Sequence, residues 1–271
     1  MNAIRVRDLR KSYGGRPAVD GVALDVREGE VFALLGPNGA GKSTTVEILE
    51  GLRRRDGGEV TVLGADPATA PRSWRADIGI VQQSATDLAE TTVREAVRHF
   101  ARYYPKPRDP EEVVDLVGLT SQAGVRAGRL SGGQRRRLDV ALGIVGRPRL
   151  LFLDEPTTGF DPEARRQFWR LVRQLSGDGT TILLTTHYLD EVEALADRLA
   201  VVAAGRVVAE GTPATLGGRD RAEALVSWTD AEGPRSRRTA RPGELIRSLG
   251  EPADLTVTRP TLEDVYLELI A

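Results

Sequence analysis

The 271-residue sequence predicts an α/β fold built on a parallel sheet, and three observations support this fold class. A glycine-rich turn joins the apolar segment 31–35, "VFALL", to a helical pattern that begins at Lys42. Two further strand-like runs, "RLLFLD" and "TTILLTTH", flank another helical pattern. A strand, a helix and a second strand in succession are typical of a parallel α/β layer. The first 35 residues alternate apolar and polar side chains around Gly14–Gly15, which predicts strands joined by a tight turn.

The middle of the chain has helical signals. The segment "GEVTVLG" reads as one more short strand, after which Thr92 and Glu95 form a capping box at a helix start. Asp109 precedes a second helix that begins with Pro110 and ends at Gly118. We therefore expect a helical insert over about residues 84–145.

The composition limits the function. Hydrophobic residues make up 40% of the chain, enough for a substantial core, and the chain could form one large domain or two. The net charge of −1 gives no sign of nonspecific nucleic-acid binding, so we expect no nucleic-acid partner. The absence of cysteine excludes disulfides and cysteine-ligated metals. No signal segment opens the sequence and no apolar run approaches 20 residues, which predicts a soluble chain.

The glycine-rich turn fits the phosphate-binding pattern G-x-x-x-x-G-K-[ST] with Gly36, Gly41, Lys42 and Ser43 in register. Backbone N–H groups and the start of a helix both attract an anion. Lys42 would contact the β- and γ-phosphates, and the Ser43 hydroxyl would bind Mg²⁺. The alternative is a turn without a ligand, but the required strand before the loop and helix after it are both present.

Two acids follow a buried strand, at Asp154 and Glu155. Ligands of parallel sheets bind beyond the carboxyl ends of the strands, where the phosphate loop also lies. Asp154 would hold Mg²⁺ and Glu155 would polarise the attacking water; the alternative is that both acids cap the next turn. His187 ends the next strand and would contact the γ-phosphate, although a histidine at a strand end is more often structural.

A second glycine-rich helix start, "LSGGQ", occurs at residues 130–134. A capping box explains Ser131 and Gln134, but it does not explain Gly132 and Gly133, which weaken a helix. A helix start without side chains suits close approach to a phosphate. Because the chain already has one complete phosphate loop, two half-sites on one chain suggest a dimer.

Together these motifs resemble the nucleotide-binding subunit of an ABC transporter, over about residues 3–217. The resemblance implies a P-loop NTPase core with an N-terminal antiparallel β subdomain and a helical signature subdomain at about 84–145. It implies an ATP-binding domain over 1–217 and a small C-terminal extension over 218–271.

The resemblance also implies site residues. The ATP-binding loop would comprise Gly36, Pro37, Asn38, Gly39, Ala40, Gly41, Lys42, Ser43 and Thr44. The signature, which contacts the partner's ATP, would comprise Leu130, Ser131, Gly132, Gly133 and Gln134. Catalysis would involve Glu155, His187 and Gln83, and Mg²⁺ would be held by Ser43, Gln83 and Asp154. Tyr13 would stack on adenine, and Asp161 would form the D-loop, although Asp161 also suits a helix N-cap before Pro162.

The tail, "GTPATLGG…PTLEDVYLELI", resembles the daunorubicin-type subgroup of drug-resistance exporters. This implies a peripheral ATPase on the cytoplasmic side of the cell membrane, with ATP and Mg²⁺ as cofactors. Its partners would be a second ATP-binding subunit, giving a homodimer, and separate integral membrane permease subunits. An importer ATPase is the alternative. A soluble ABC ATPase that acts on DNA or ribosomes is disfavoured, because the chain has one motif set, no cysteine and no coiled-coil heptads.

The last helix should begin near Thr261, with Asp264 as a capping partner. An apolar stripe follows i, i+3, i+4, i+7 spacing at Leu262, Val265, Tyr266 and Leu269. A free helix of this length is marginal in water, so it must dock. We expect it to dock on the small C-terminal domain, with the other protomer or the membrane partner as alternatives.

Overall fold

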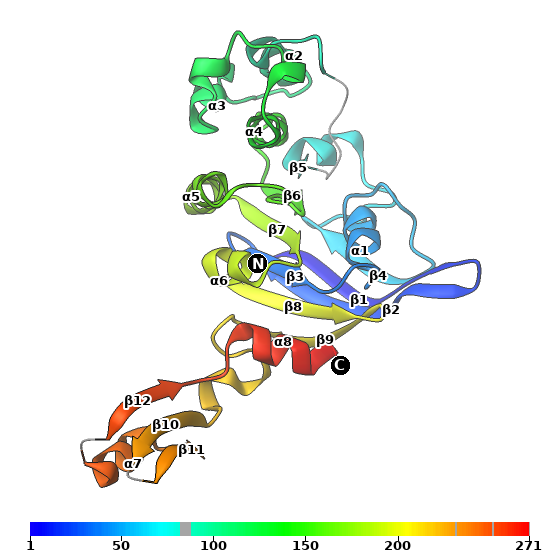
Figure 1. Cartoon of the computed structure of the whole chain (residues 1–271). Coiled ribbons are helices and arrows are strands. Elements are labelled where there is room, and N and C mark those ends of the chain that lie inside the picture. The colour runs from blue at the N-terminus through cyan, green and yellow to red at the C-terminus, as the bar shows by residue number, and fades with distance from the viewer. Residues whose placement is uncertain (82–87, 231, 251, 271) are drawn as a thin grey trace.

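The structure is a computed structural model that describes residues 1–81, 88–230, 232–250 and 252–270. A six-stranded sheet with the strand order β5-β6-β7-β3-β8-β9 forms its centre (Figure 1). Its strands are β3 (Val31–Leu35), β5 (Ile78–Val81), β6 (Leu150–Asp154), β7 (Thr181–Thr186), β8 (Arg198–Ala203) and β9 (Arg206–Gly211). All neighbours in the sheet are parallel except β8 and β9, so the predicted α/β class is confirmed.

The central strand β3 is apolar throughout because both of its faces are covered. Val31, Ala33 and Leu35 pack into a core shared with helices on one face of the sheet. Phe32 and Leu34 point to the other face, where helix α1 (Lys42–Leu49) and the N-terminal strands contribute. A strand buried on both faces has a continuous apolar run in place of alternation.

The N-terminal strands form a separate antiparallel sheet of β1 (Asn2–Tyr13), β2 (Arg16–Arg27) and β4 (Gly57–Val62), in the order β2-β1-β4. Gly14 and Gly15 make the turn between β1 and β2 with positive φ angles of 54° and 78°, as the sequence predicted.

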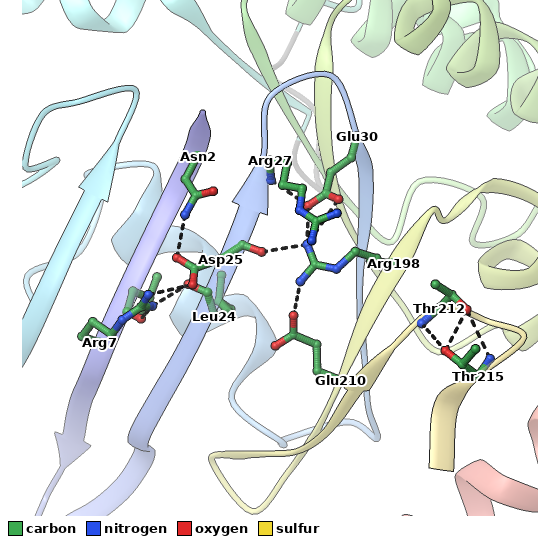
Figure 2. A network of polar contacts seen from close by, with 11 residues as sticks. Asn2, Arg7, Leu24, Asp25, Arg27, Glu30, Arg198, Glu210, Thr212 and Thr215 are labelled. Carbon is green, nitrogen blue, oxygen red and sulfur yellow. Dashed lines mark hydrogen bonds and ion pairs between the residues drawn. The ribbon is translucent and has the colours of Figure 1, made fainter. Parts of the chain in front are cut away.

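A polar network joins this sheet to the central one (Figure 2). Arg198, on β8, donates to the nearly buried Glu30 carboxylate at 2.8 Å, to Glu210 on β9 and to the Asp25 carbonyl. The Asp25 carboxylate in turn accepts from Arg7 on β1 at 2.7 Å. The two sheets are therefore held together by charge as well as by their shared core.

The predicted helical insert is present over the described residues 88–145. Helices α2 (Val93–Ala101), α3 (Pro110–Leu116) and α4 (Gly132–Ile144) form it. Thr92 and Glu95 make the predicted capping box, and the Asp109 carboxylate caps α3. Helices α5 (Pro162–Gly177) and α6 (Leu189–Leu195) then follow β6 and β7.

The C-terminal region contains strands that the sequence reading did not predict. β10 (Ala224–Asp230), β11 (Gly233–Thr239) and β12 (Ala253–Thr258) form an antiparallel sheet in the order β11-β10-β12. Helix α7 (Pro242–Leu249) packs on β10. Figure 1 shows this small sheet at the opposite end of the molecule from α2 and α3.

The last helix, α8 (Leu262–Ile270), is capped as predicted, with the Asp264 N–H donating to the Thr261 hydroxyl at 3.1 Å. Its apolar stripe, however, packs into the core of the ATP-binding half, against α6, β8 and β9. The expected docking on the small C-terminal domain is therefore wrong. Gly217 permits this packing, because a Cβ there would lie 2.5 Å from a Val265 methyl carbon.

Arg219 fixes the start of α8. Its Nη1 atom donates to the Glu193 carboxylate on α6 at 2.8 Å and to the Pro213 carbonyl at 3.0 Å. Its Nε atom donates to the Pro260 carbonyl at 2.9 Å.

In the described part of the chain, none of the helices combines the length and apolar character required to span a bilayer.

Candidate functional site

The glycine loop joins β3 to α1, as its sequence pattern predicted. A Cβ at Gly36 would lie 2.3 Å from the Val202 carbonyl oxygen, and a Cβ at Gly41 would lie 2.3 Å from the Ala18 carbonyl oxygen. Gly41 also has a φ of 100°, which disfavours other residues. The loop thus needs glycine because it passes close to the backbones of β8 and β2.

A pocket of about 330 Å³ lies over this loop. It is lined by Ala18, Asn38, Gly39, Gly41, Lys42, Ser43, Thr44 and Glu155. The structure therefore brings the glycine loop and Glu155 together at the carboxyl ends of β3 and β6, as the parallel sheet predicted. Ala18, on β2, is a lining residue that the sequence reading missed, because no local pattern distinguishes it.

The Lys42 side chain is buried against the loop. Its Nζ atom donates to the carbonyl oxygens of Gly36 at 2.7 Å and Pro37 at 3.0 Å. Burial lowers the pKa of Lys42, and the charges of Glu155 and Asp154 oppose this effect. A cation that is held between the loop and two carboxylates is well placed to meet an anionic ligand.

The two acids lie beside β7, the neighbouring strand. The Asp154 carboxylate accepts a hydrogen bond from the Thr185 hydroxyl, and the Glu155 N–H donates to the Thr185 carbonyl at 3.1 Å. The Glu155 Oε1 atom lies 3.3 Å from Nδ1 of His187. Glu155 and His187 are thus brought together. The alternative that the acids cap the next turn holds in part for Glu155, whose Oε2 atom accepts from the Thr158 hydroxyl at 3.5 Å, while helix α5 is capped by Asp161.

The signature residues lie on a second pocket, of about 530 Å³, at the start of α4. Ser131 and Gln134 form the expected capping box. A Cβ added at Gly132 would have no atom within 4 Å, and a Cβ added at Gly133 would meet only the Ala164 side chain, at 3.7 Å. Leu130 differs from these residues because it packs against the core. Contacts within the described chain therefore do not require the two glycines.

Asp161 lines this second pocket and also caps α5. Its carboxylate accepts from the N–H groups of Glu163 at 2.9 Å and Ala164 at 2.8 Å. These backbone hydrogen bonds lower the pKa of Asp161, and the one from Ala164 has the largest effect. The helix-capping role is confirmed. The D-loop role stays a prediction, and the position of Asp161 beside the signature is compatible with it.

Tyr13 lies at the end of β1 with 42% of its surface exposed. Tyr13 is not among the residues that line the first pocket, and two cationic side chains lie over its ring. Lys11 Nζ lies 5.6 Å and the Arg53 guanidinium 5.3 Å from the ring centroid. Gln83 lies outside the described residues.

The first site offers two side-chain oxygen donors that suit Mg²⁺. Ser43 lines the pocket, and Asp154 ends the strand that carries Glu155. Within the described ranges no three histidine or acidic side chains gather as a metal site. Mg²⁺ is commonly held by one or two protein oxygens together with substrate phosphates, so this sparse donor set suits it.

The sequence reading missed two polar side chains that support the acids. The Thr185 hydroxyl bonds to Asp154, and Arg136 on α4 donates to the backbone carbonyl of Asp154 at 2.6 Å and of Pro156 at 3.1 Å. Arg136 is one of three consecutive arginines, and only the helical phase of α4 selects the one that faces the core.

Comparisons with known proteins agree with this geometry. The family model described as "ABC transporter" matches residues 19–158. The daunorubicin resistance ATP-binding protein DrrA2 of Streptomyces coeruleorubidus is 40% identical, over 98% of this chain and 94% of its own. The Nod factor export ATP-binding protein I of Rhizobium sp. (strain N33) is 44% identical, over 79% of this chain and 72% of its own.

A solved structure described as an ATP-binding subunit of an ABC transporter matches 98% of this chain and 99% of its own. Its TM-score is 0.75 and its identity is 24%, which supports the fold alone. The family model and the two relatives carry the assignment. The chain therefore belongs to the ABC transporter family, as an ATP-binding subunit that hydrolyses ATP to drive transport.

Proposed function

We propose that the chain powers export of a drug-like or lipid-like substrate through separate membrane permease subunits, to which it binds on the cytoplasmic side of the membrane. The similarity to proteins named for daunorubicin resistance and for Nod factor export supports the direction and the substrate class. ATP would bind at the interface of a head-to-tail homodimer.

The observation that best supports a dimer is that one chain has two separate pockets with no lining residue in common. The first holds the phosphate loop and Glu155, and the second holds Ser131 and the two signature glycines. Contacts within the described chain do not require glycine at either position. In a head-to-tail dimer, the second pocket of one chain would cover the nucleotide in the first pocket of the other.

Within each composite site, the residues of the first pocket would act on the γ-phosphate. Lys42 would move from the loop carbonyls to the phosphates, and Glu155 would orient the attacking water. His187, 3.3 Å from Glu155, would contact the γ-phosphate. Ser43, Asp154 and Gln83 would hold Mg²⁺, which neutralises phosphate charge during transfer. Tyr13 would stack on adenine and Asp161 would contact the partner chain.

A mixing experiment tests the dimer. Ser131→Arg blocks the signature of one chain, and Lys42→Ala disables the loop of another. Both chains also carry Glu155→Gln, which keeps the side-chain shape but slows hydrolysis. Each double variant alone should remain monomeric with Mg-ATP, whereas their mixture should form a dimer with one intact composite site. Light scattering after size-exclusion chromatography measures the mass.

The control is Glu155→Gln alone, which should form a dimer with Mg-ATP. A mixture that stays monomeric while this control forms a dimer contradicts the head-to-tail arrangement.

Export is tested separately, with daunorubicin as a fluorescent probe. Cells that express the chain with its permease should accumulate less probe than cells with the Glu155→Gln variant. Greater accumulation would indicate import.

A further inference from the structure

Glu155 has an unusual backbone conformation. Its φ angle is +44°, in the left-handed region that residues with a Cβ rarely adopt. Such a conformation persists only where the surrounding structure holds it, and it is common at functional sites.

Arg136 binds the backbone on both sides of Glu155. Its Nη2 atom donates to the Asp154 carbonyl at 2.6 Å, and its Nε atom donates to the Pro156 carbonyl at 3.1 Å. The residue is only 8% exposed. A guanidinium presents several donors in a rigid plane, so one side chain can hold two carbonyls in a fixed relation.

Neighbouring acids partly offset the cost of burying the Arg136 charge. Burial lowers the pKa of Arg136, while the nearby carboxylates of Asp139, Asp154 and Glu191 favour the charged form. Glu191, on α6, is itself fully buried. A charge-assisted hydrogen bond inside a protein is stronger than a neutral one, which suits a group that must hold a strained backbone.

We propose that Arg136 is a positioning residue that holds the segment 154–156 with Glu155 in its left-handed conformation. The proposal rests on the role given above to the Glu155 carboxylate. Arg136 belongs to α4, five residues after Ser131 at the signature. It therefore connects the surface that would meet the partner's nucleotide with the carboxylate at the chain's own nucleotide pocket.

Steady-state hydrolysis and ATP binding provide the first test. Arg136→Met keeps an unbranched apolar stem of similar length but removes every donor. Its kcat should fall about 10- to 100-fold, because small misplacements of catalytic groups have effects of this size. Its ATP dissociation constant should stay within about twofold, since Arg136 does not line the nucleotide pocket. Arg136→Lys, with one remaining point of attachment, should give an intermediate kcat.

Arg55→Met is the matched control. Arg55 is also partly buried, and it donates to the Gly58 carbonyl at 2.9 Å and to the Asp66 carboxylate, away from the nucleotide pocket. This control should lose stability without the specific loss of kcat. Equal kcat values for Arg136→Met and Arg55→Met would overturn the proposal.

The second test does not depend on hydrolysis. Glu155→Gly and Glu155→Ala both lack the carboxylate, but only alanine is strained at a φ of +44°. The glycine variant should therefore melt about 2–4 °C above the alanine variant. With Arg136→Met added to both variants, or Arg136→Lys if the methionine variant does not fold, the difference should shrink, because the backbone at residue 155 is no longer held in the left-handed region.

An unchanged difference in Tm would overturn the proposal. This readout also separates the two claims. If the protein does not hydrolyse ATP, the proposed function fails, but the melting temperatures still decide whether Arg136 holds the backbone at residue 155.

Discussion

Glu50 shows how one buried carboxyl group makes stability depend on pH. It ends helix α1 with 5% exposure, and burial, followed by the charge of Asp154, raises its pKa from 4.5 to about 8. The folded state thus binds a proton that the unfolded state releases above pH 4.5. This contribution to stability is complete below pH 4.5 and is lost as the pH rises toward 8.

Glu50→Gln should remove this dependence, because the amide stays neutral. The variant and the parent should differ by a constant amount below pH 4.5. Between pH 4.5 and 8 the variant should gain relative stability, with an upper bound of about 5 kcal/mol. Urea unfolding at several pH values measures the difference. Parallel stability curves across this range would contradict the prediction.

At the same scale, the sequence predicted residues whose chemistry depends on their immediate neighbours. Lys42 and Glu155 were found because a phosphate loop and a strand-end acid pair have fixed spacing. Arg136 and Thr185 were not found, since their partners are backbone or side-chain atoms of another element. No local pattern encodes such a contact.

At the scale of elements, periodicity found several helices and strands but missed all three strands of the small sheet, as well as β8 in the central sheet. The strand β12 is exposed along its whole length, and β11 is rich in arginine, so neither has a buried face to produce alternation. The helix α8 was predicted with its cap and its apolar stripe. Its docking surface was not, because a stripe shows that a face is buried without identifying what covers it.

The docking of α8 leads to a stability prediction with a control on the same helix. Leu262 is 1% exposed in the core of the ATP-binding half, and Leu267 is 53% exposed. Leu262→Ala should lower the free energy of unfolding by about 2–4 kcal/mol. Leu267→Ala should change it by less than about 0.5 kcal/mol. Chemical denaturation followed by tryptophan fluorescence compares them, and equal effects would be inconsistent with this docking.

At the scale of the whole molecule, the small sheet is an excursion from the ATP-binding half. The chain leaves at Arg219 and returns at Pro260, and a 2.9 Å hydrogen bond joins these two residues. A short Gly-Ser linker can therefore replace residues 223–258 without displacing α8. This deletion should leave ATP affinity within about threefold of the parent, a difference below about 1 kcal/mol. Titration with a fluorescent ATP analogue measures it.

A matched deletion that ends the chain after Gly217 removes α8 as well. It should lower the melting temperature strongly, because it uncovers the core around Leu216. If the internal deletion lost ATP binding, the small sheet would be an integral part of the nucleotide site.

The hydrogen bond between Arg219 and Pro260 also affects how the protein responds to a protease. A single cut within β11 or the loops of the small sheet would divide the polypeptide, yet α8 would stay in place through its apolar contacts and the cap at Thr261. The nicked chain should run as two fragments in a denaturing gel and as one particle in native buffer. Sequence distance along the tail is therefore a poor guide to which residues are lost together when the tail is cleaved.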